Sequence, residues 1–227
     1  VTTFKRDLQK ALLKLVVKRF ICANDEIRMR ISTPRASVLP MGIEEVIDFR
    51  PRESRPSRSR PTLGWGVNPQ SHYQINDHAD SLAKLCEFFD FVILSGKAPK
   101  LDLPYKFIAY SPENEKKFFS SVDFGFSPST ESFFDRAKTP IKIIQHLAHG
   151  SPVITTSPWT FDSFGKSLGG IILLAPQSSL LDLLNAYWIN YANYLEMSNR
   201  ALTRAKSLHS ASANGRALLA ILKGEAE

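Results

Sequence analysis

The side chains best suited to binding or catalysis lie on one short stretch, where Lys142, Gln145, His146 and His149 follow the spacing i, i+3, i+4 and i+7. That spacing places all four on one face of a helix. Lys142 falls in the first helical turn, where free N–H groups already carry partial positive charge. A lysine is useful there when a phosphate or diphosphate binds at the helix start. The alternative interpretation is a solvated surface lysine.

The elements on either side of this helix follow from local sequence signals. VDFGF (122–126) indicates a buried strand, and PVITT (152–156) indicates a second one. Between them, Thr139 is predicted to be the N-cap and Pro140 the first helical residue, where its missing N–H is tolerated. Gly150 follows the helix, at the position where a left-handed conformation ends it.

The same succession of apolar strands and helices extends over residues 62–175. Continuous apolar strands separated by helices indicate a parallel sheet that is covered on both faces. The sequence therefore predicts an α/β fold with a doubly wound, Rossmann-like parallel sheet of about six strands and flanking helices. The strands are expected at 62–66, 91–96, 105–110, 122–126, 152–156 and 169–175, and helices at 75–89 and, with Ser111 as N-cap and Pro112 next, at 111–121.

Further elements are expected outside this unit. They are, in chain order, a helix over 4–20, a strand with a partial helix over 20–31, a strand within 36–42, an exposed connector over 48–60, a short mixed stretch over 161–166, and helices over 179–224 with a break near 210–215.

Ligands of doubly wound sheets bind beyond the carboxyl ends of the strands. This rule selects the loops after strands 62–66, 91–96 and 122–126, together with the start of the helix that carries Lys142. In the first of these strands, Gly64 and Gly66 would let a ligand approach the backbone closely. The G-W-G sequence lacks the full G-x-G-x-x-G pattern, and no acidic residue follows at the place that a dinucleotide ribose needs. It is a weak motif by itself.

Composition indicates a folded protein, because the 227 residues are 43% hydrophobic and 22% charged. No apolar run approaches the roughly 18 residues needed to cross a bilayer, and no secretory leader is visible. Cys22 and Cys86 lie far apart and show no metal-binding spacing, which favours free thiols and a cytoplasmic location.

The net charge of +7 is unevenly distributed, with five arginines in 50–60 and six basic residues in 4–20. Such clusters can contact nucleic acid or an anionic membrane surface. The arginine tract is rich in Pro and Ser and has no aromatic residue, which favours a solvated linker over a base-stacking surface. Nucleic acid is therefore not the expected partner, whereas peripheral membrane contact stays open.

Four segments resemble, in order and spacing, the motifs of one enzyme family. VLPMGIE (38–44) is similar to its V-I-P-N-G-V-D motif, TLGWGVNPQSH (62–72) to its first strand and glycine loop, and DFGFSPS (123–129) with PIKIIQHLAHGSPVITT (140–156) to its P-x-K-x-x-E-x-x-A-x-G-x-P-V-I-A-T segment. The family is the GT-B-fold nucleotide-sugar glycosyltransferases, in particular the retaining group of glycogen-synthase-like and mannosyltransferase-like enzymes. The chain resembles their C-terminal, donor-binding domain.

This resemblance implies four parts: a remnant of the N-terminal acceptor domain (1–37), an interdomain linker (38–60), the nucleotide-sugar-binding domain (61–195) and closing helices (196–227). In the family, the acceptor binds the N-terminal domain and transfer occurs in the cleft between the two domains. The chain is therefore expected to carry the donor-binding domain of a glycosyltransferase and not to complete the transfer unaided.

The resemblance also implies a donor site at the predicted helix of the 140s. The phosphates would lie near Gly64, Gly66 and Lys142, and the side chain at 145 would reach the nucleotide ribose. The family usually has glutamate at that position and another acid eight residues earlier, where this chain has Gln145 and Ala137. A glutamine still hydrogen-bonds a ribose hydroxyl, although it carries no charge.

The family's basic pair after the first strand is missing here, and Lys97 or Lys138 are the candidates to replace it. The full set of expected nucleotide-sugar contacts is Gly64, Gly66, Asn68, Lys97, Ser129, Lys138, Lys142, Ile143 and Gln145. No metal and no cofactor beyond the donor substrate are expected. The acceptor, whether a saccharide, a lipid or a protein, is not specified by the sequence.

Other polar residues near these loops have two interpretations each. Glu131 and Asp135 could contact a sugar hydroxyl or be solvated loop acids. Ser129 and Thr130 could donate to a phosphate or stabilise a turn. Trp65 could stack on a nucleobase, although a tryptophan at a strand end is more often part of the core.

The two histidines lack the partners that catalysis or metal binding needs. His146 and His149 show i, i+3 spacing, but no further ligands are evident for a metal, so solvated or capping roles are expected. No Ser-His-Asp or Cys-His arrangement indicates a catalytic nucleophile. Glycosyl transfer is the preferred function. The alternatives are a non-catalytic domain of the same fold, given Gln145 and Ala137, and a basic protein that binds nucleic acid or a membrane surface.

Overall fold

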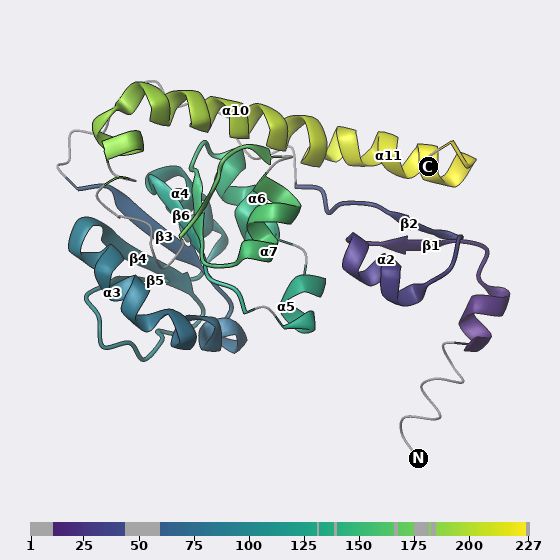
Figure 1. Ribbon diagram of the computed structural model, residues 1–227, viewed down its shortest axis with the longest axis horizontal. Coiled ribbons are helices and arrows are strands. Elements are labelled where there is room, and N and C mark those ends of the chain that lie inside the picture. The colour runs from purple at the N-terminus through teal and green to yellow at the C-terminus, as the bar shows by residue number, and fades with distance from the viewer. Residues whose placement is uncertain are drawn as a thin grey trace, which may run out of the picture.

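The computed structural model describes residues 11–43, 60–130, 132–138, 140–165, 168–174, 182 and 185–225. These residues form a six-stranded sheet and a separate two-stranded sheet, and every strand pair in both is parallel (Figure 1). The strands of the large sheet are β3 (Thr62–Gly66), β4 (Asp90–Ser95), β5 (Lys106–Ala109), β6 (Phe124–Ser127), β7 (Val153–Thr155) and β8 (Ile171–Leu173).

The strand order β5-β4-β3-β6-β7-β8 is that of a doubly wound sheet. The chain moves outward from β3 to β5 and then returns to place β6 on the other side of β3. These two strands pair directly, with Leu63 opposite Phe124 and Gly64 opposite Gly125. The predicted Rossmann-like α/β fold is confirmed. The carboxyl ends of β3 and β6 mark the point where the winding reverses, the usual ligand position in such folds.

The two faces of the central strands differ in side-chain size. On one face, Leu63 and Phe124 belong to a buried cluster that also contains residues of the 3-10 helix η1 (Pro69–His78) and of α3 (Ala79–Phe88). On the other face, glycines alternate with these residues under α4 (Pro112–Ser121) and α6 (Ile141–Ala148). A Cβ at Gly64 would lie 2.6 Å from Val122 Cγ1. The two helices therefore pack directly on the strand backbone.

Several predicted helix ends are confirmed. Ser111 caps α4 by accepting a hydrogen bond from the Asn114 N–H at 3.1 Å. Gly150 follows α6 with a φ of 68°, in the left-handed region. The expected break in the C-terminal helices lies at Ser210, which separates α10 (Tyr191–His209) from α11 (Ala211–Lys223) and caps α11 through the Ala213 N–H.

Some local predictions are wrong. The helix expected over 75–89 begins at Ala79, and η1 occupies most of the preceding polar loop, starting at Pro69. The polar loop after β6 contains a short helix, α5 (Phe133–Ala137). Pro140 is the N-cap of α6 and not its first residue, and Thr139 lies outside the described residues. Shifts of one residue at helix ends are common because the terminal hydrogen bonds are weak.

The helix expected over 4–20 is also shorter among the described residues. It ends at residue 16, because Phe20 pairs with Ala36 at the start of a parallel two-stranded sheet. This sheet is formed by β1 (Phe20–Cys22) and β2 (Ala36–Val38), which flank α2 (Asp25–Ile31). We call β1, α2 and β2 the upstream unit. The remaining short elements are α7 (Pro158–Thr160) and the π-helical turns η2 (Phe161–Gly165) and η3 (Asn185–Ile189).

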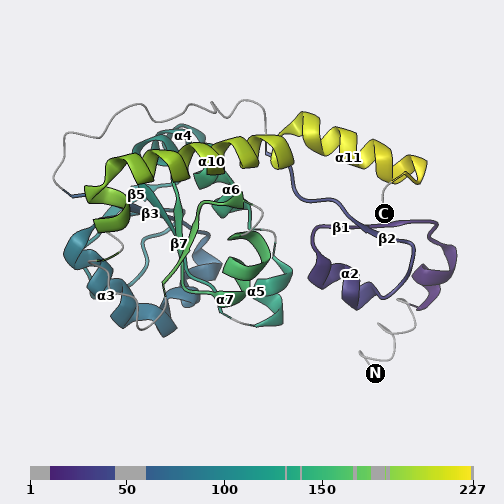
Figure 2. The same cartoon turned by 45° about the horizontal axis from the view of Figure 1, so that its top comes forward.

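The chain after the upstream unit is attached to the C-terminal helices, and Figures 1 and 2 show the unit beside α11. Ile43 forms a bridge with Ser210, and the His209 Nδ1 lies 3.1 Å from the Met41 carbonyl oxygen. The three boundaries between the four proposed parts stay predictions, and the expected connector lies outside the described residues except for Arg60. No helix in the described ranges has both the length and the apolar character needed to span a membrane.

Both cysteines, Cys22 and Cys86, are buried and free. Burial raises the pKa of the Cys86 thiol to about 11, and the charge of Arg60 lowers it by a smaller amount. This thiol is therefore a part of the core and not a nucleophile at neutral pH.

Candidate functional site

A cavity of about 460 Å³ lies at the carboxyl ends of β3 and β6, where the winding of the sheet reverses. We call it the switch-point cavity. Its walls are formed by the β3–η1 turn, the end of β6, the segment between β6 and α6, and the start of α6. Two residues of α7 and one residue after β2 complete them. The residues that line it include Met41, Gly66, Asn68, Gln74, Ser129, Asp135, Lys138, Pro140, Ile141, Lys142, Ile143 and Trp159.

The start of α6 gives one wall of this cavity a positive potential. Pro140 is the N-cap and supplies no side-chain hydrogen bond, and the first turn contains no acidic residue. The N–H groups of the first turn of a helix have no partner within the helix. Pro140, Ile141, Lys142 and Ile143 all line the cavity. An anion in the cavity would therefore meet free backbone donors and the positive end of the helix dipole.

The two glycines of β3 have different surroundings. Gly66 lines the cavity, and a Cβ added there would meet Phe118 and Phe119 at 3.5 Å, an ordinary contact. Gly64 does not line it, since its Cα faces Val122 and Phe118 beneath α4. The structure thus brings Gly66 to the site with Asn68 of the following turn, whereas the small size of Gly64 serves helix packing.

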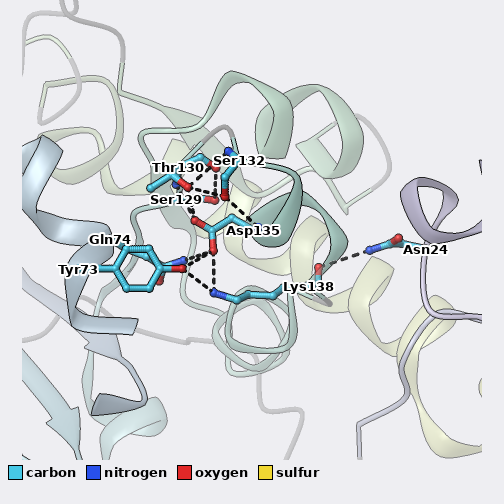
Figure 3. A network of polar contacts seen from close by, with 8 residues as sticks. All are labelled: Asn24, Tyr73, Gln74, Ser129, Thr130, Ser132, Asp135 and Lys138. Carbon is cyan, nitrogen blue, oxygen red and sulfur yellow. Dashed lines mark hydrogen bonds and ion pairs between the residues drawn. The ribbon is translucent and has the colours of Figure 1, made fainter. Parts of the chain in front are cut away.

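Asp135 of α5 lines the cavity and forms the centre of a polar network (Figure 3). Its side chain is fully buried. The Oδ1 atom accepts hydrogen bonds from Tyr73 Oη at 3.0 Å, Gln74 Nε2 at 3.0 Å and Lys138 Nζ at 2.6 Å. The Oδ2 atom accepts from the Thr130 N–H at 3.1 Å and from the Thr130 hydroxyl. The acceptor capacity of this carboxylate is used by the protein itself.

These contacts also fix the charge of Asp135. Burial raises the pKa of its carboxyl group, but hydrogen bonds from Lys138, Thr130 and Tyr73 outweigh burial and hold the pKa at about 2. The interpretation of Asp135 as a solvated loop acid is wrong. The sequence does contain a signal for α5, which the sequence analysis did not use: Ser132 and Asp135 form the S-x-x-D pattern of a helix start. In the structure, Ser132 accepts a hydrogen bond from the Asp135 N–H. Glu131 lies outside the described residues.

Two lysines line the cavity, and each is paired with an acidic residue. Lys138 Nζ lies 2.6 Å from Asp135 Oδ1, and its pKa is raised because bonds to Asp135 and Tyr73 outweigh the lowering effect of burial. Lys142 Nζ lies 2.7 Å from Glu115 Oε1 on α4. The other candidate cation, Lys97, does not line the cavity. Of the predicted replacements for a basic pair, the structure therefore places Lys138 at the site and Lys97 outside it.

The face of α6 that carries Gln145, His146 and His149 was predicted to be a polar surface, but part of it packs against aromatic side chains. His146 is 1% exposed, with its ring centroid 4.7 Å from that of Phe119, so the expectation of a solvated or capping histidine is wrong for this residue. Its ring lies over Gly125. His149 has a capping role, since its Nδ1 lies 2.8 Å from the Gln145 carbonyl oxygen.

The remaining candidates divide between the cavity and the core. Ser129 and Ile143 line the cavity, whereas Gln145 does not. The Gln145 Oε1 atom is buried and has no hydrogen-bond partner among the described residues. Trp65 is 3% exposed and belongs to the main core, although one side of it reaches the cavity wall. Its interpretation as a core residue is confirmed.

The upstream unit contacts the segment that carries Asp135 and Lys138, which sequence reasoning did not detect. Asn24 Nδ2 donates to the carbonyl oxygens of Arg136 at 3.2 Å and Ala137 at 3.1 Å, while its Oδ1 caps α2. Figure 3 shows the longer contact of the same Nδ2 atom with the Lys138 carbonyl oxygen, at 3.5 Å. Arg30 stacks over the Phe133 ring at 3.5 Å. Because these pairs lie more than a hundred residues apart along the chain, no local sequence pattern reports them.

A second cavity, of about 660 Å³, lies at the opposite, amino ends of β3, β4 and β5. Arg60, Asp90, Tyr105 and Lys106 line it, and Arg60 pairs with Asp90 at 3.5 Å. It is larger than the switch-point cavity, but the described residues of its wall include no helix N-terminus. Among the described residues, no group of three or more His, Cys, Asp or Glu side chains could hold a metal ion.

No protein-family model and no curated protein sequence matches this chain. Solved structures do. The sucrose-phosphate synthase of Thermosynechococcus elongatus has a TM-score of 0.68 at 14% identity, with 95% of this chain and 60% of that chain covered. Anabaena HepE, solved in complex with UDP and glucose, has a TM-score of 0.70 at 11% identity, with coverage of 96% and 66%. A glycosyltransferase from Rickettsia africae has a TM-score of 0.68 at 13% identity, with coverage of 95% and 66%.

These similarities show the fold. The chain has the GT-B glycosyltransferase fold that its sequence predicts, with the six-stranded sheet as the Rossmann-like half. The chain spans between 60% and 66% of the three solved structures.

Proposed function

We propose that this chain is the donor-binding part of a glycosyltransferase that transfers a hexosyl group from a nucleoside diphosphate sugar to an acceptor. One observation carries the proposal: the first turn of α6, Lys138 and Lys142 converge on a cavity at the switch point of a GT-B fold. The cavity volume of about 460 Å³ lies in the range of small-ligand sites. The complex of Anabaena HepE with UDP and glucose supports the ligand class.

In this proposal the diphosphate lies at the start of α6. The N–H groups of residues 141–143 donate to its oxygens, and Lys142 balances part of its charge. Lys138, which stays paired with Asp135 at the cavity wall, adds a further N–H donor. Gly66 keeps the β3–η1 turn free of a side chain near the ligand. The amides of Asn68 and Gln74 supply donors and acceptors for hydroxyl groups.

The same groups would assist the transfer itself. The bond between the anomeric carbon of the sugar and the diphosphate oxygen breaks, and the electron pair stays on the diphosphate. Backbone donors and lysines that are already in position stabilise this developing negative charge. The acceptor hydroxyl oxygen forms the new bond to the anomeric carbon, and its proton passes to the departing diphosphate. The acceptor, a saccharide, lipid or protein, would bind a second domain opposite the switch-point cavity.

A second candidate is a non-catalytic domain of the same fold. The observation that favours it is the position of Gln145, which does not line the cavity and whose Oε1 atom is buried. A side chain in this position makes no ribose contact unless it changes rotamer. A protein of this kind would bind a nucleotide weakly or not at all.

We also propose a cytoplasmic location with peripheral contact to an anionic membrane. The first described helix leaves Leu12, Leu15 and Val16 between 52% and 77% exposed, close in sequence to Lys14 and Lys18. Exposed apolar side chains with adjacent lysines are typical of helices that bind at membrane interfaces. Co-sedimentation with phosphatidylglycerol vesicles tests this, and equal recovery with phosphatidylcholine vesicles would contradict it.

Isothermal titration calorimetry with UDP, GDP, ADP and CMP, with and without Mg²⁺, tests the main proposal. We expect selective binding of one nucleoside diphosphate. Lys142→Ala should weaken it about tenfold or more, the worth of a charge-assisted hydrogen bond. Lys84→Ala removes an exposed lysine of α3 outside the cavity and serves as the matched control. Binding of none of the four would contradict the proposed site. So would an affinity in both Lys142→Ala and Lys138→Ala that equals the affinity of the wild type.

A further inference from the structure

The charges at the switch-point cavity balance each other in the structure. Of the described residues that line it, the charged ones are Asp135, Lys138 and Lys142. Lys138 is neutralised by Asp135, and Lys142 is neutralised by Glu115 of α4. If the cavity binds a diphosphate, as proposed above, at least one lysine has to exchange its carboxylate partner for the ligand. The two pairs differ in how easily they can do so.

The Lys138–Asp135 pair is built into the protein. The Asp135 side chain is fully buried and accepts hydrogen bonds from Tyr73, Gln74 and Thr130 in addition to Lys138. Withdrawal of Lys138 would leave a buried carboxylate without its only cationic partner in the described network, which is costly. Lys138 is therefore held at the cavity wall and is not exchangeable.

The Lys142–Glu115 pair has the opposite character. Its side chains are 33% and 22% exposed, so each carboxylate or ammonium group can be hydrated once the pair opens. Apart from Lys142, the described partner of the Glu115 carboxylate is the Tyr110 hydroxyl at 3.3 Å. Opening this pair therefore leaves no buried charge.

The position of Lys142 also permits the exchange. This lysine lines the switch-point cavity and, in addition, a neighbouring cavity of about 120 Å³ between the ends of β3 and β4, where Tyr110 forms part of the wall. Its Cδ atom would lie 3.7 Å from a Cβ at Gly66, so its aliphatic stem crosses the strand end between the two cavities. Rotation of the outer side-chain bonds carries the ammonium group from one cavity towards the other.

We propose that Glu115 is an internal competitor of the ligand: Lys142 leaves Glu115 and pairs with the diphosphate, and Glu115 thereby sets the affinity of the cavity. The exchange involves no proton transfer, and the same lysine carries one carboxylate or phosphate partner at a time. This proposal rests on the proposed function, since it specifies how the same cavity binds its ligand. Glu115 lies outside the main cavity and affects the ligand through Lys142.

Glu115→Gln tests the proposal, because glutamine keeps the shape of the side chain and removes its charge. The probes are inorganic pyrophosphate and UDP, titrated calorimetrically into the full 227-residue chain. We expect the affinity for both to rise about three- to fivefold, in line with the worth of a partly exposed ion pair. Glu113→Gln, on the same helix and fully exposed to solvent, changes net charge equally and should leave the affinity within about twofold.

A double-mutant cycle separates competition from general electrostatics. In the Lys142→Ala background, Glu115→Gln should no longer raise the affinity. If Glu115 instead only holds α4 to α6, Glu115→Gln will lower the melting temperature and leave the affinity equal to that of the wild type, which overturns the proposal. An equal gain in Glu113→Gln overturns it as well.

The outcomes distinguish this proposal from the proposed function. Binding by the wild type that is unchanged in Glu115→Gln keeps the donor site and rejects the competition. Binding that is seen only in Glu115→Gln supports both. No binding of pyrophosphate or UDP to the wild type or to any variant rejects both.

Discussion

The Asp135 network allows a quantitative prediction about stability and pH. The folded protein holds the carboxyl pKa of Asp135 at about 2, against an ordinary value of 3.8. This gap corresponds to about 2 kcal/mol of stabilisation of the charged form. Because the pKa is lower in the folded state, the stabilisation is fully present above about pH 4 and is lost as the pH falls through the folded pKa.

Asp135→Asn removes the charge and keeps the shape, so we expect the free energy of unfolding at pH 7 to fall by about 2 kcal/mol or more. The difference between wild type and variant should shrink steadily between pH 4 and pH 2. Urea denaturation followed by tryptophan fluorescence at pH 7, 4, 3 and 2.5 measures it. Asp102→Asn, an exposed position before β5, is the matched control and should change stability by less than about 0.5 kcal/mol. A variant as stable as the wild type at pH 7, or a difference independent of pH, would show that the charge of Asp135 does not stabilise the folded protein.

Three further predictions concern the glycines of β3, the contact of Asn24 with α5, and the reactivity of the Cys86 thiol. Gly64→Ala should destabilise the protein by about 1–3 kcal/mol, since its Cβ would lie 2.6 Å from Val122 Cγ1, whereas Gly66→Ala meets only contacts of 3.5 Å or more and should cost less than about 1 kcal/mol in the same thermal unfolding experiment. Asn24→Ser keeps the cap of α2 but loses the contacts to Arg136 and Ala137, and should lower the free energy of unfolding by about 1–2 kcal/mol; an unchanged urea midpoint would show that these contacts contribute nothing. Cys86 should react with a thiol reagent at pH 8 only at the rate of global unfolding, because burial holds its pKa at about 11, and fast labelling of the folded protein would contradict this.

Much of the fold could be predicted because its signals are local. The apolar runs of β3, β4 and β6, the Ser111-Pro112 start of α4 and the Gly150 end of α6 each report on a few neighbouring residues. The parallel sheet then follows from the alternation of such strands with helices. The resemblance of four segments to GT-B enzymes identified the fold more specifically, and the solved structures confirm it.

The site was less predictable because its geometry depends on contacts between distant residues. The pairing of Lys142 with Glu115 joins two helices, and the Asn24 contact with Ala137 joins two units of the chain. His146 illustrates the same limit. Helical spacing correctly put it on the face with Lys142, but the glycine at 125 opens a space under that face, and the imidazole fills it next to Phe119.

Whether the switch-point cavity binds the nucleotide can be measured by amide NMR of the ¹⁵N-labelled protein during titration with the nucleoside diphosphate that binds best. We expect the largest chemical-shift changes at residues 141–143 of α6 and 66–68 of the β3–η1 turn, whose backbone groups line or border the switch-point cavity. Changes centred on Arg60, Tyr105 and Lys106 would place the ligand in the cavity at the opposite end of the sheet and contradict the proposed donor site. So would a spectrum that does not change.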